Sequence, residues 1–110
     1  MKNNIKEINI KKGTIEFWIK EDKVDYSGDE PVVLFELNPL GGSILIAKDS
    51  DKKIKFLHVF LGKGRTDAEY DVSKLDNGKR HMFVFTWSVK NKKIKIYIDG
   101  ELKKTAKISY

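Results

Sequence analysis

The sequence predicts an all-β protein, an antiparallel sandwich or barrel of eight or nine short strands. Three observations lead to this fold class. Apolar and polar residues alternate with a period of two over most of the chain, turn-forming residues separate these runs at close spacing, and no stretch shows the 3.6-residue apolar periodicity of a helix. The length of 110 residues predicts one domain, spanning residues 1–110.

The first predicted strand and hairpin lie in the N-terminal half. In residues 15–19, apolar residues alternate with Glu16 and Trp18, which places the two sets on opposite faces of a strand. Residues 31–37 and 43–47 are β-branched and aromatic runs separated by a turn that contains proline and two glycines. These two runs predict a hairpin.

The middle of the chain predicts a buried strand between polar turns. Residues 53–61 are apolar on both parities at their centre, so we expect a strand inside a sheet that is covered on both faces. The preceding residues 48–52 are polar and predict a turn. Residues 66–72 predict a weaker strand.

The C-terminal third contains the clearest pattern. In residues 80–88, three aromatic residues share one parity, and in residues 93–98 three isoleucines do the same. Asp99 and Gly100 then separate the second run from residues 101–108, a signal for a tight hairpin because both turn positions require positive φ. The aromatic residues and isoleucines are therefore predicted to face one core.

Composition indicates which classes of binding partner to expect. The net charge of +6 comes almost entirely from lysines that alternate with apolar residues, and Arg65 and Arg80 are the only arginines. This pattern predicts solvated strand faces and protected edges, and no specific nucleic-acid surface. No apolar run is long enough to span a membrane, and no secretory signal is visible, so we expect a cytoplasmic protein or a domain excised from a larger surface protein. The chain has no cysteine, so its stability is predicted to come from packing alone.

Two segments resemble a known family. Residues 13–20 read Gly-Thr-Ile-Glu-Phe-Trp-Ile-Lys, and residues 80–87 end in Thr-Trp before a strand that finishes Ile-Tyr-Ile-Asp-Gly. This order and spacing are similar to those of laminin-G-like and concanavalin A-like domains. The resemblance implies a jelly-roll β-sandwich. Because the chain is shorter than most such domains, we expect either a minimal version of the sandwich or one that completes itself by pairing its sheet edges with another copy in a homo-oligomer.

Four residues are candidate carbohydrate contacts. Trp18 shares its strand face with Glu16, and an aromatic ring beside a carboxylate is the arrangement that stacks on a sugar while bonding its hydroxyls. The resemblance favours a buried framework role for Trp18. Tyr70 and Asp71 form the second candidate pair. Glu69 completes a Glu-x-Asp pattern similar to the start of a glycosidase motif, whose third acid is missing here.

The sequence predicts no catalytic residue, no metal site and no cofactor. His58 and His81 lie among apolar residues, where a neutral histidine with a hydrogen-bond partner is expected. Aspartates cluster at residues 22–29 and 49–51, and turn formation accounts for them better than calcium does. We therefore expect a non-catalytic binding module for a glycan or a protein ligand. The alternatives are an assembly domain, which a strict monomer in light scattering would contradict, and a glycoside hydrolase remnant.

Overall fold

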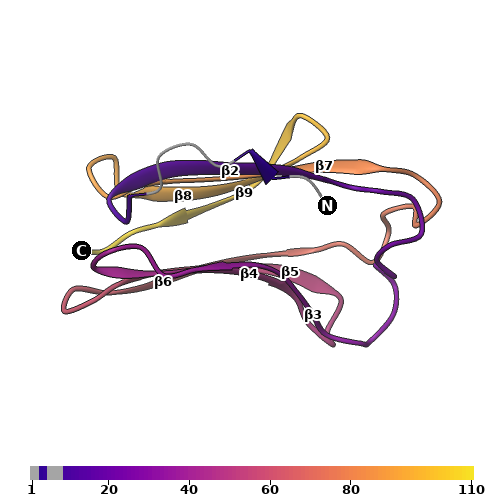
Figure 1. The fold of residues 1–110 in the computed structure, drawn as a ribbon, viewed down its shortest axis with the longest axis horizontal. Helices are drawn as coiled ribbons and strands as arrows, with labels where there is room; N and C mark the ends of the chain where they lie inside the picture. Colours follow the sequence, from indigo (N-terminus) through magenta and orange to yellow (C-terminus); the bar gives the residue numbers. More distant parts are fainter. Residues whose placement is uncertain (1–2, 5–8) are drawn as a thin grey trace.

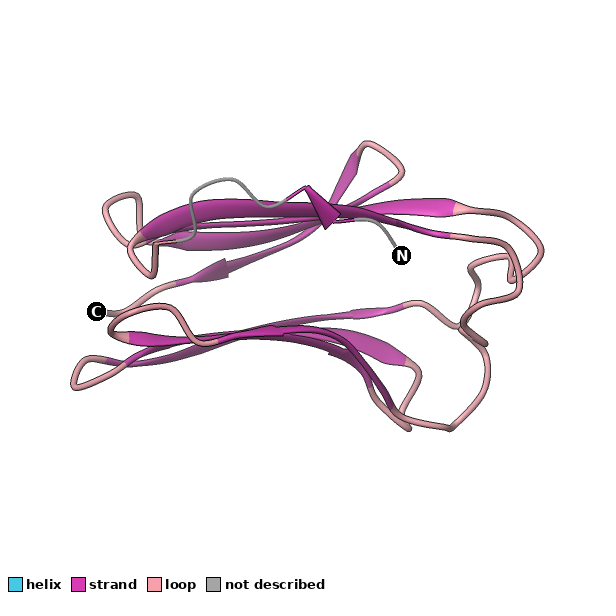
Figure 2. Cartoon of the chain, viewed as in Figure 1, coloured by secondary structure: helices cyan, strands magenta, loops and turns pink. Residues whose placement is uncertain are grey.

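Two antiparallel β-sheets lie face to face and form the body of the molecule (Figure 1). The computed structural model describes residues 3–4 and 9–110. Every regular element in these residues is a strand, in agreement with the all-β sandwich predicted from the sequence (Figure 2). The described residues contain no helix that could cross a membrane.

The five-stranded sheet joins both ends of the chain. Its order is β1-β2-β7-β8-β9, so the early strand β2 pairs along its whole length with the late strand β7. The outer strands β1 and β9 form its edges. The strands are β1 Asn3–Asn4, β2 Lys12–Ile19, β7 His81–Ser88, β8 Lys93–Ile98 and β9 Glu101–Lys107.

The four-stranded sheet is a meander of consecutive strands in the order β3-β4-β5-β6. The predicted hairpin is confirmed, because β3 and β4 pair antiparallel across the turn that contains Pro39 and Gly41. Strands β3 and β6 form the edges of this sheet. The strands are β3 Val32–Leu37, β4 Gly42–Lys48, β5 Lys53–Phe60 and β6 Gly64–Asp71.

The core fills the space between the two inner faces. Phe83, Phe85 and Trp87 are all buried, and each lies opposite a buried isoleucine of β8, which confirms the predicted core-forming hairpin. Phe56 reaches across from the four-stranded sheet, and its ring centroid lies 5.3 Å from that of Phe85. The aromatic side chains therefore connect the two layers.

Strand β5 departs from its prediction on one face. It lies between β4 and β6, as expected for a strand inside a sheet, but only one of its faces is fully buried. Lys53, Lys55 and Leu57 point outward and are half-buried. The prediction of cover on both faces is wrong. On the outer surface Leu57 lies opposite Leu45 of β4, both are half-buried, and no layer lies above them among the described residues.

Lys48 also departs from its prediction. The sequence places it in a polar turn, but β4 continues through it, and the alternation that buries Ile44 and Ile46 carries Lys48 inward as well. Its Nζ donates hydrogen bonds to the carbonyl oxygens of Gly28, Glu30 and Asp49 at 2.8, 3.0 and 3.3 Å. Three bonds to backbone oxygens satisfy the buried ammonium and attach the loop before β3 to the sheet.

Candidate binding face

The outer face of the five-stranded sheet carries polar side chains in ordered rows. Strands β2, β7 and β8 bury one parity and turn the other outward. The register sets the outward residues in cross-strand rows, one residue from each strand: Lys12, Ser88 and Lys93 in the first row, and Thr14, Thr86 and Lys95 in the second. Residues from distant parts of the chain thus form one polar surface.

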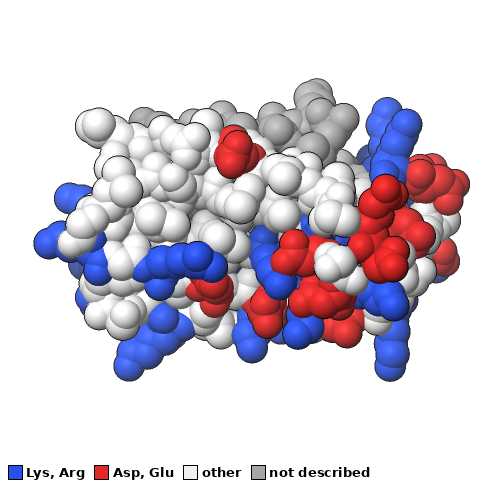
Figure 3. All heavy atoms as spheres, turned by 90° about the horizontal axis from the view of Figure 1, so that it is seen from below, with Lys and Arg blue, Asp and Glu red and all other residues white. Residues whose placement is uncertain are grey.

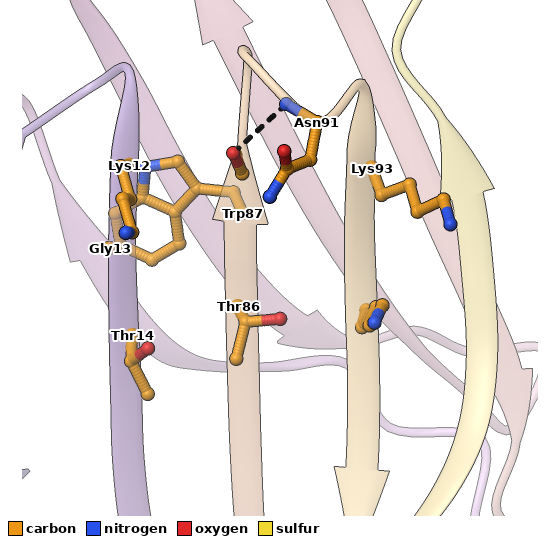
Figure 4. Close-up of a pocket in the computed structure, with 9 residues that line it drawn as sticks. Lys12, Gly13, Thr14, Thr86, Trp87, Asn91 and Lys93 are labelled. Carbon is orange, nitrogen blue, oxygen red and sulfur yellow. Dashed lines mark hydrogen bonds between the residues drawn. The ribbon is translucent and has the colours of Figure 1, made fainter.

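A hollow of about 440 Å³ opens over these two rows (Figure 4). Its lining combines ammonium groups, hydroxyls and one amide, and no carboxylate is present among the described lining residues. Thr14 and Thr86 lie side by side on neighbouring strands, and the turn carrying Asn91 closes one end (Figure 4). The described lining residues are Lys12, Gly13, Thr14, Thr86, Trp87, Ser88, Asn91, Lys93 and Lys95.

Gly13 and Trp87 form the floor of this hollow. The two residues are register partners, and a β-carbon on Gly13 would lie 2.3 Å from Cζ2 of the Trp87 indole. Glycine is required here because the indole passes under β2 where any side chain would stand. The indole Nε1 donates a hydrogen bond to the carbonyl of Asn9 at 2.7 Å, which fixes the ring in place.

Trp18 lies toward the other end of the same face. The sequence favoured a buried framework role, but the ring is 43% exposed and lies outside the core, because its parity is the outward parity of β2. The guanidinium carbon of Arg80 lies 4.7 Å from the ring centroid, a cation–π contact. A second hollow of about 390 Å³ adjoins the ring and is lined by Trp18, Ile19, Lys20, Lys23, Val24, Val32, Val33 and Leu34.

The other predicted contacts divide between the sheets. Glu16 lies two residues before Trp18 on the same outward face, so these two are brought together. Tyr70 belongs to β6 in the other sheet, where it packs half-buried against the core with Lys103 Nζ 6.0 Å from its ring centroid. Asp71 points to the opposite face of β6 from Tyr70. The structure therefore offers two separate pairs, and Trp18 is the one of the four residues that lines the second hollow.

Asp71 is occupied by its own turn. Its Oδ1 accepts hydrogen bonds from the Ser73 hydroxyl at 2.6 Å and from the Ser73 backbone N–H at 2.8 Å. These two bonds, the hydroxyl first, lower the pKa of Asp71. A glycosidase acid requires the opposite shift, since it must hold its proton near neutral pH.

The acidic clusters gather at one end of the four-stranded sheet, at the right of Figure 3. Asp49 and Asp51 form ion pairs with Lys55 Nζ at 2.6 and 3.3 Å. Asp25 accepts hydrogen bonds from Asn77 and from Ser27. Their carboxylates thus bond to neighbouring side chains and turns, and the described residues hold no group of three metal-ligating side chains.

The two histidines are both buried, but only His81 contacts a carboxylate among the described residues. His58 is fully buried, its Nε2 donates to the carbonyl of Ile10 at 2.6 Å, and its Nδ1 faces the Tyr110 hydroxyl at 2.9 Å. Burial lowers the pKa of His58, which favours the neutral imidazole that the sequence predicts. Burial also disfavours charge on His81, but the Asp99 carboxylate at 2.7 Å and the Asp76 carbonyl outweigh it and raise the pKa of His81.

These shifts predict how stability depends on pH. His58 contributes stability above its unfolded pKa near 6.5 that is lost on acidification, whereas His81 contributes stability that is complete below that pKa and is lost as the pH rises through its raised value. Asp99→Asn removes the carboxylate that favours protonated His81. As the pH falls from neutral to mildly acidic, we therefore expect the free energy of unfolding, measured by urea denaturation, to decrease more in Asp99→Asn than in the wild type. Asparagine keeps the oxygen that accepts the Met82 N–H and tolerates the positive φ of 52°. Parallel pH profiles of the two proteins would contradict this.

The fold and this face together define a class: an antiparallel two-sheet β-sandwich with an exposed aromatic ring and a polar hollow on the outside of one sheet. Residues 3–110 match a laminin-G family model described as the concanavalin A-like lectin/glucanases superfamily. The chain belongs to this superfamily, as its sequence resemblance predicts, and membership supports a role as a binding module in general. No curated protein and no solved structure matches the chain.

Sequence reasoning did not find the polar hollow. Its lysines are visible in the sequence as alternating residues, a pattern that predicts solvated strand faces. The missing information was the register, which places Lys12 in one row with Ser88 and Lys93, about 80 residues along the chain. The only local signal was the polar parity shared by Thr14 and Thr86.

Proposed function

We propose that this protein is a carbohydrate-binding module that uses Trp18 as its sugar platform. The exposed indole beside the second hollow carries the proposal. Tryptophan is usually mostly buried, and an exposed ring loses the hydrophobic stabilisation of its large apolar area unless a ligand covers it. The apolar C–H face of a pyranose is such a ligand.

Polar groups around the ring suit the hydroxyls of the same sugar. Glu16 lies two residues away on the same face, roughly 7 Å along the strand, and offers carboxylate acceptors. Lys20 and Lys23 line the hollow and offer ammonium donors. Arg80 holds the indole through its cation–π contact, so less side-chain freedom is lost when a sugar stacks on it.

The test is a glycan array followed by calorimetry on the glycans retained. We expect Trp18→Ala to lower affinity by about 5- to 150-fold, since stacking on one aromatic ring is worth about 1–3 kcal/mol. The matched control is Leu61→Ala, which removes another exposed apolar side chain in the turn after β5. Its affinity should be unchanged.

Fluorescence gives an independent measurement, because the protein has two tryptophans in different environments. Trp87 is 2% exposed and Trp18 is 43% exposed, so their fluorescence emission should differ. A ligand that stacks on Trp18 should shift only the emission component that the Trp18→Phe substitution removes. Absence of binding to every glycan class, or equal binding by Trp18→Ala, would contradict the proposal. The assembly alternative stays a prediction, and light scattering of the same samples bears on it.

A further inference from the structure

Two of the three lysines of the first hollow occupy positions that edge protection does not explain. Lysine commonly protects the edge strands of a sheet, but β2 lies between β1 and β7, and β8 lies between β7 and β9. Lys93 and Lys95 are therefore on an interior strand, whereas Lys12 lies on β2 beyond its pairing with β1, which reaches only Glu16 and Phe17. None of the three forms an ion pair with a carboxylate among the described residues.

Their arrangement also opposes stability. Lys93 lies directly opposite Lys107 on β9, and it shares an outward face with Lys95 two residues on. Like charges placed opposite each other across strands are destabilising. A surface that collects positive charge at a cost to the free energy of folding is typical of a site for an anion.

Neutral donors complete the hollow. Ser88 lies between Lys12 and Lys93 in the first cross-strand row, and Thr14 and Thr86 share the second row with Lys95. The Ser88 oxygen already accepts a hydrogen bond from the Asn91 backbone N–H at 3.1 Å, drawn as the dashed line in Figure 4. Because that oxygen has an internal donor, its own O–H proton can be directed to a ligand.

We propose that this hollow is an oxyanion site that binds two neighbouring phosphate, sulfate or carboxylate groups of one ligand. Lys12 and Lys93 are separated by one strand, about 10 Å across the sheet, so their ammonium groups can each contact one of two neighbouring anionic groups. Lysine acts as a point charge and not as a bidentate fork, so the site selects the spacing of charges more than the geometry of one group. The site lies apart from Trp18 and does not depend on the proposed sugar platform.

Calorimetry with inorganic tripolyphosphate tests this directly. We expect binding at about 10 mM ionic strength that weakens at about 150 mM, where the Debye length falls from about 30 Å to about 8 Å. Each ammonium is expected to contribute about fivefold, so the double variant Lys93→Gln/Lys95→Gln should lose about 25-fold in affinity. Because both substitutions remove repulsion, the urea midpoint should be unchanged or raised.

The control removes the same charge from elsewhere. Lys63→Gln/Lys79→Gln changes two exposed lysines outside the hollow, and we expect its affinity to fall less than twofold. Thr86→Val should weaken binding to a similar extent at both salt concentrations, since it removes a neutral donor. Trp18→Ala should bind tripolyphosphate as the wild type does, which separates this site from the sugar platform.

Sulfated dextran and polygalacturonate, run beside tripolyphosphate, identify the oxyanion. If the protein binds one of the three polyanions more tightly, and Lys93→Gln/Lys95→Gln loses this preference, the result supports the site. It also identifies the oxyanion that the site binds. Absence of binding to all three probes overturns the proposal. An equal loss in the two double variants also overturns it, because the attraction would then follow net charge alone.

Discussion

Replacing Trp87 with alanine is expected to lower the free energy of unfolding by about 3–5 kcal/mol, the range for removing a large aromatic from a core. The side chain is 2% exposed and packs edge-on against Phe56, with ring centroids 6.2 Å apart. Its removal leaves a cavity between the sheets. It also removes the donor to the Asn9 carbonyl, so the loss combines packing with an unpaired acceptor.

Urea denaturation measures this effect, and the second tryptophan supplies the control. Trp18→Ala should cost less than about 1 kcal/mol, because its ring lies on the surface and its removal opens no cavity. Similar losses in the two variants would show that Trp18 also supports the fold. The predicted contrast is what allows Trp18→Ala to report on ligand binding with the sandwich intact.

The parts of the fold predicted from the sequence are those set by local patterns. The alternation in β7 and β8 identified the buried faces, because side chains of a strand point alternately to its two sides. The turn between β8 and β9 was equally local: Asp99 and Gly100 have φ of 52° and 83°, the positive values that the Asp-Gly signal predicts. The paired motifs then identified the superfamily, which the family match confirms.

The candidate sites depend on information that local patterns do not contain. Which outward residues become neighbours is decided by the pairing of β2 with β7, strands from opposite ends of the chain. The sequence therefore grouped Tyr70 with Trp18 as contacts, although they lie in different sheets. Whether the outward residues of a strand are covered by another part of the chain also depends on tertiary contacts. The sequence does not show that the face carrying Trp18 is open, and a framework role is therefore the favoured expectation for this residue.

Lys48 shows that local sequence patterns can also be insufficient within a single strand. Its parity continues that of Ile44 and Ile46, which indicates an inward position, while its charge indicates a turn. The charge is tolerated inside because two backbone carbonyls of the loop before β3 and that of the next residue, Asp49, converge on it. A convergence of that kind joins residues about 20 positions apart and leaves no periodic signal.

Replacing Lys48 with methionine is therefore expected to lower the free energy of unfolding by about 2–4 kcal/mol. Methionine keeps much of the length and apolar stem but donates no hydrogen bond, so the carbonyls of Gly28, Glu30 and Asp49 lose a charged donor inside the protein. Lys63→Met, in an exposed turn, should change stability by less than about 0.5 kcal/mol. Hydrogen exchange should show residues 22–30 losing protection in Lys48→Met and not in Lys63→Met, because the ammonium is what attaches that loop to β4. Wild-type stability together with wild-type exchange in Lys48→Met would contradict this. The loop would then be held by its other contacts, the buried Tyr26 ring and the hydrogen bonds that Asn77 accepts from Tyr26 N–H and donates to Asp25.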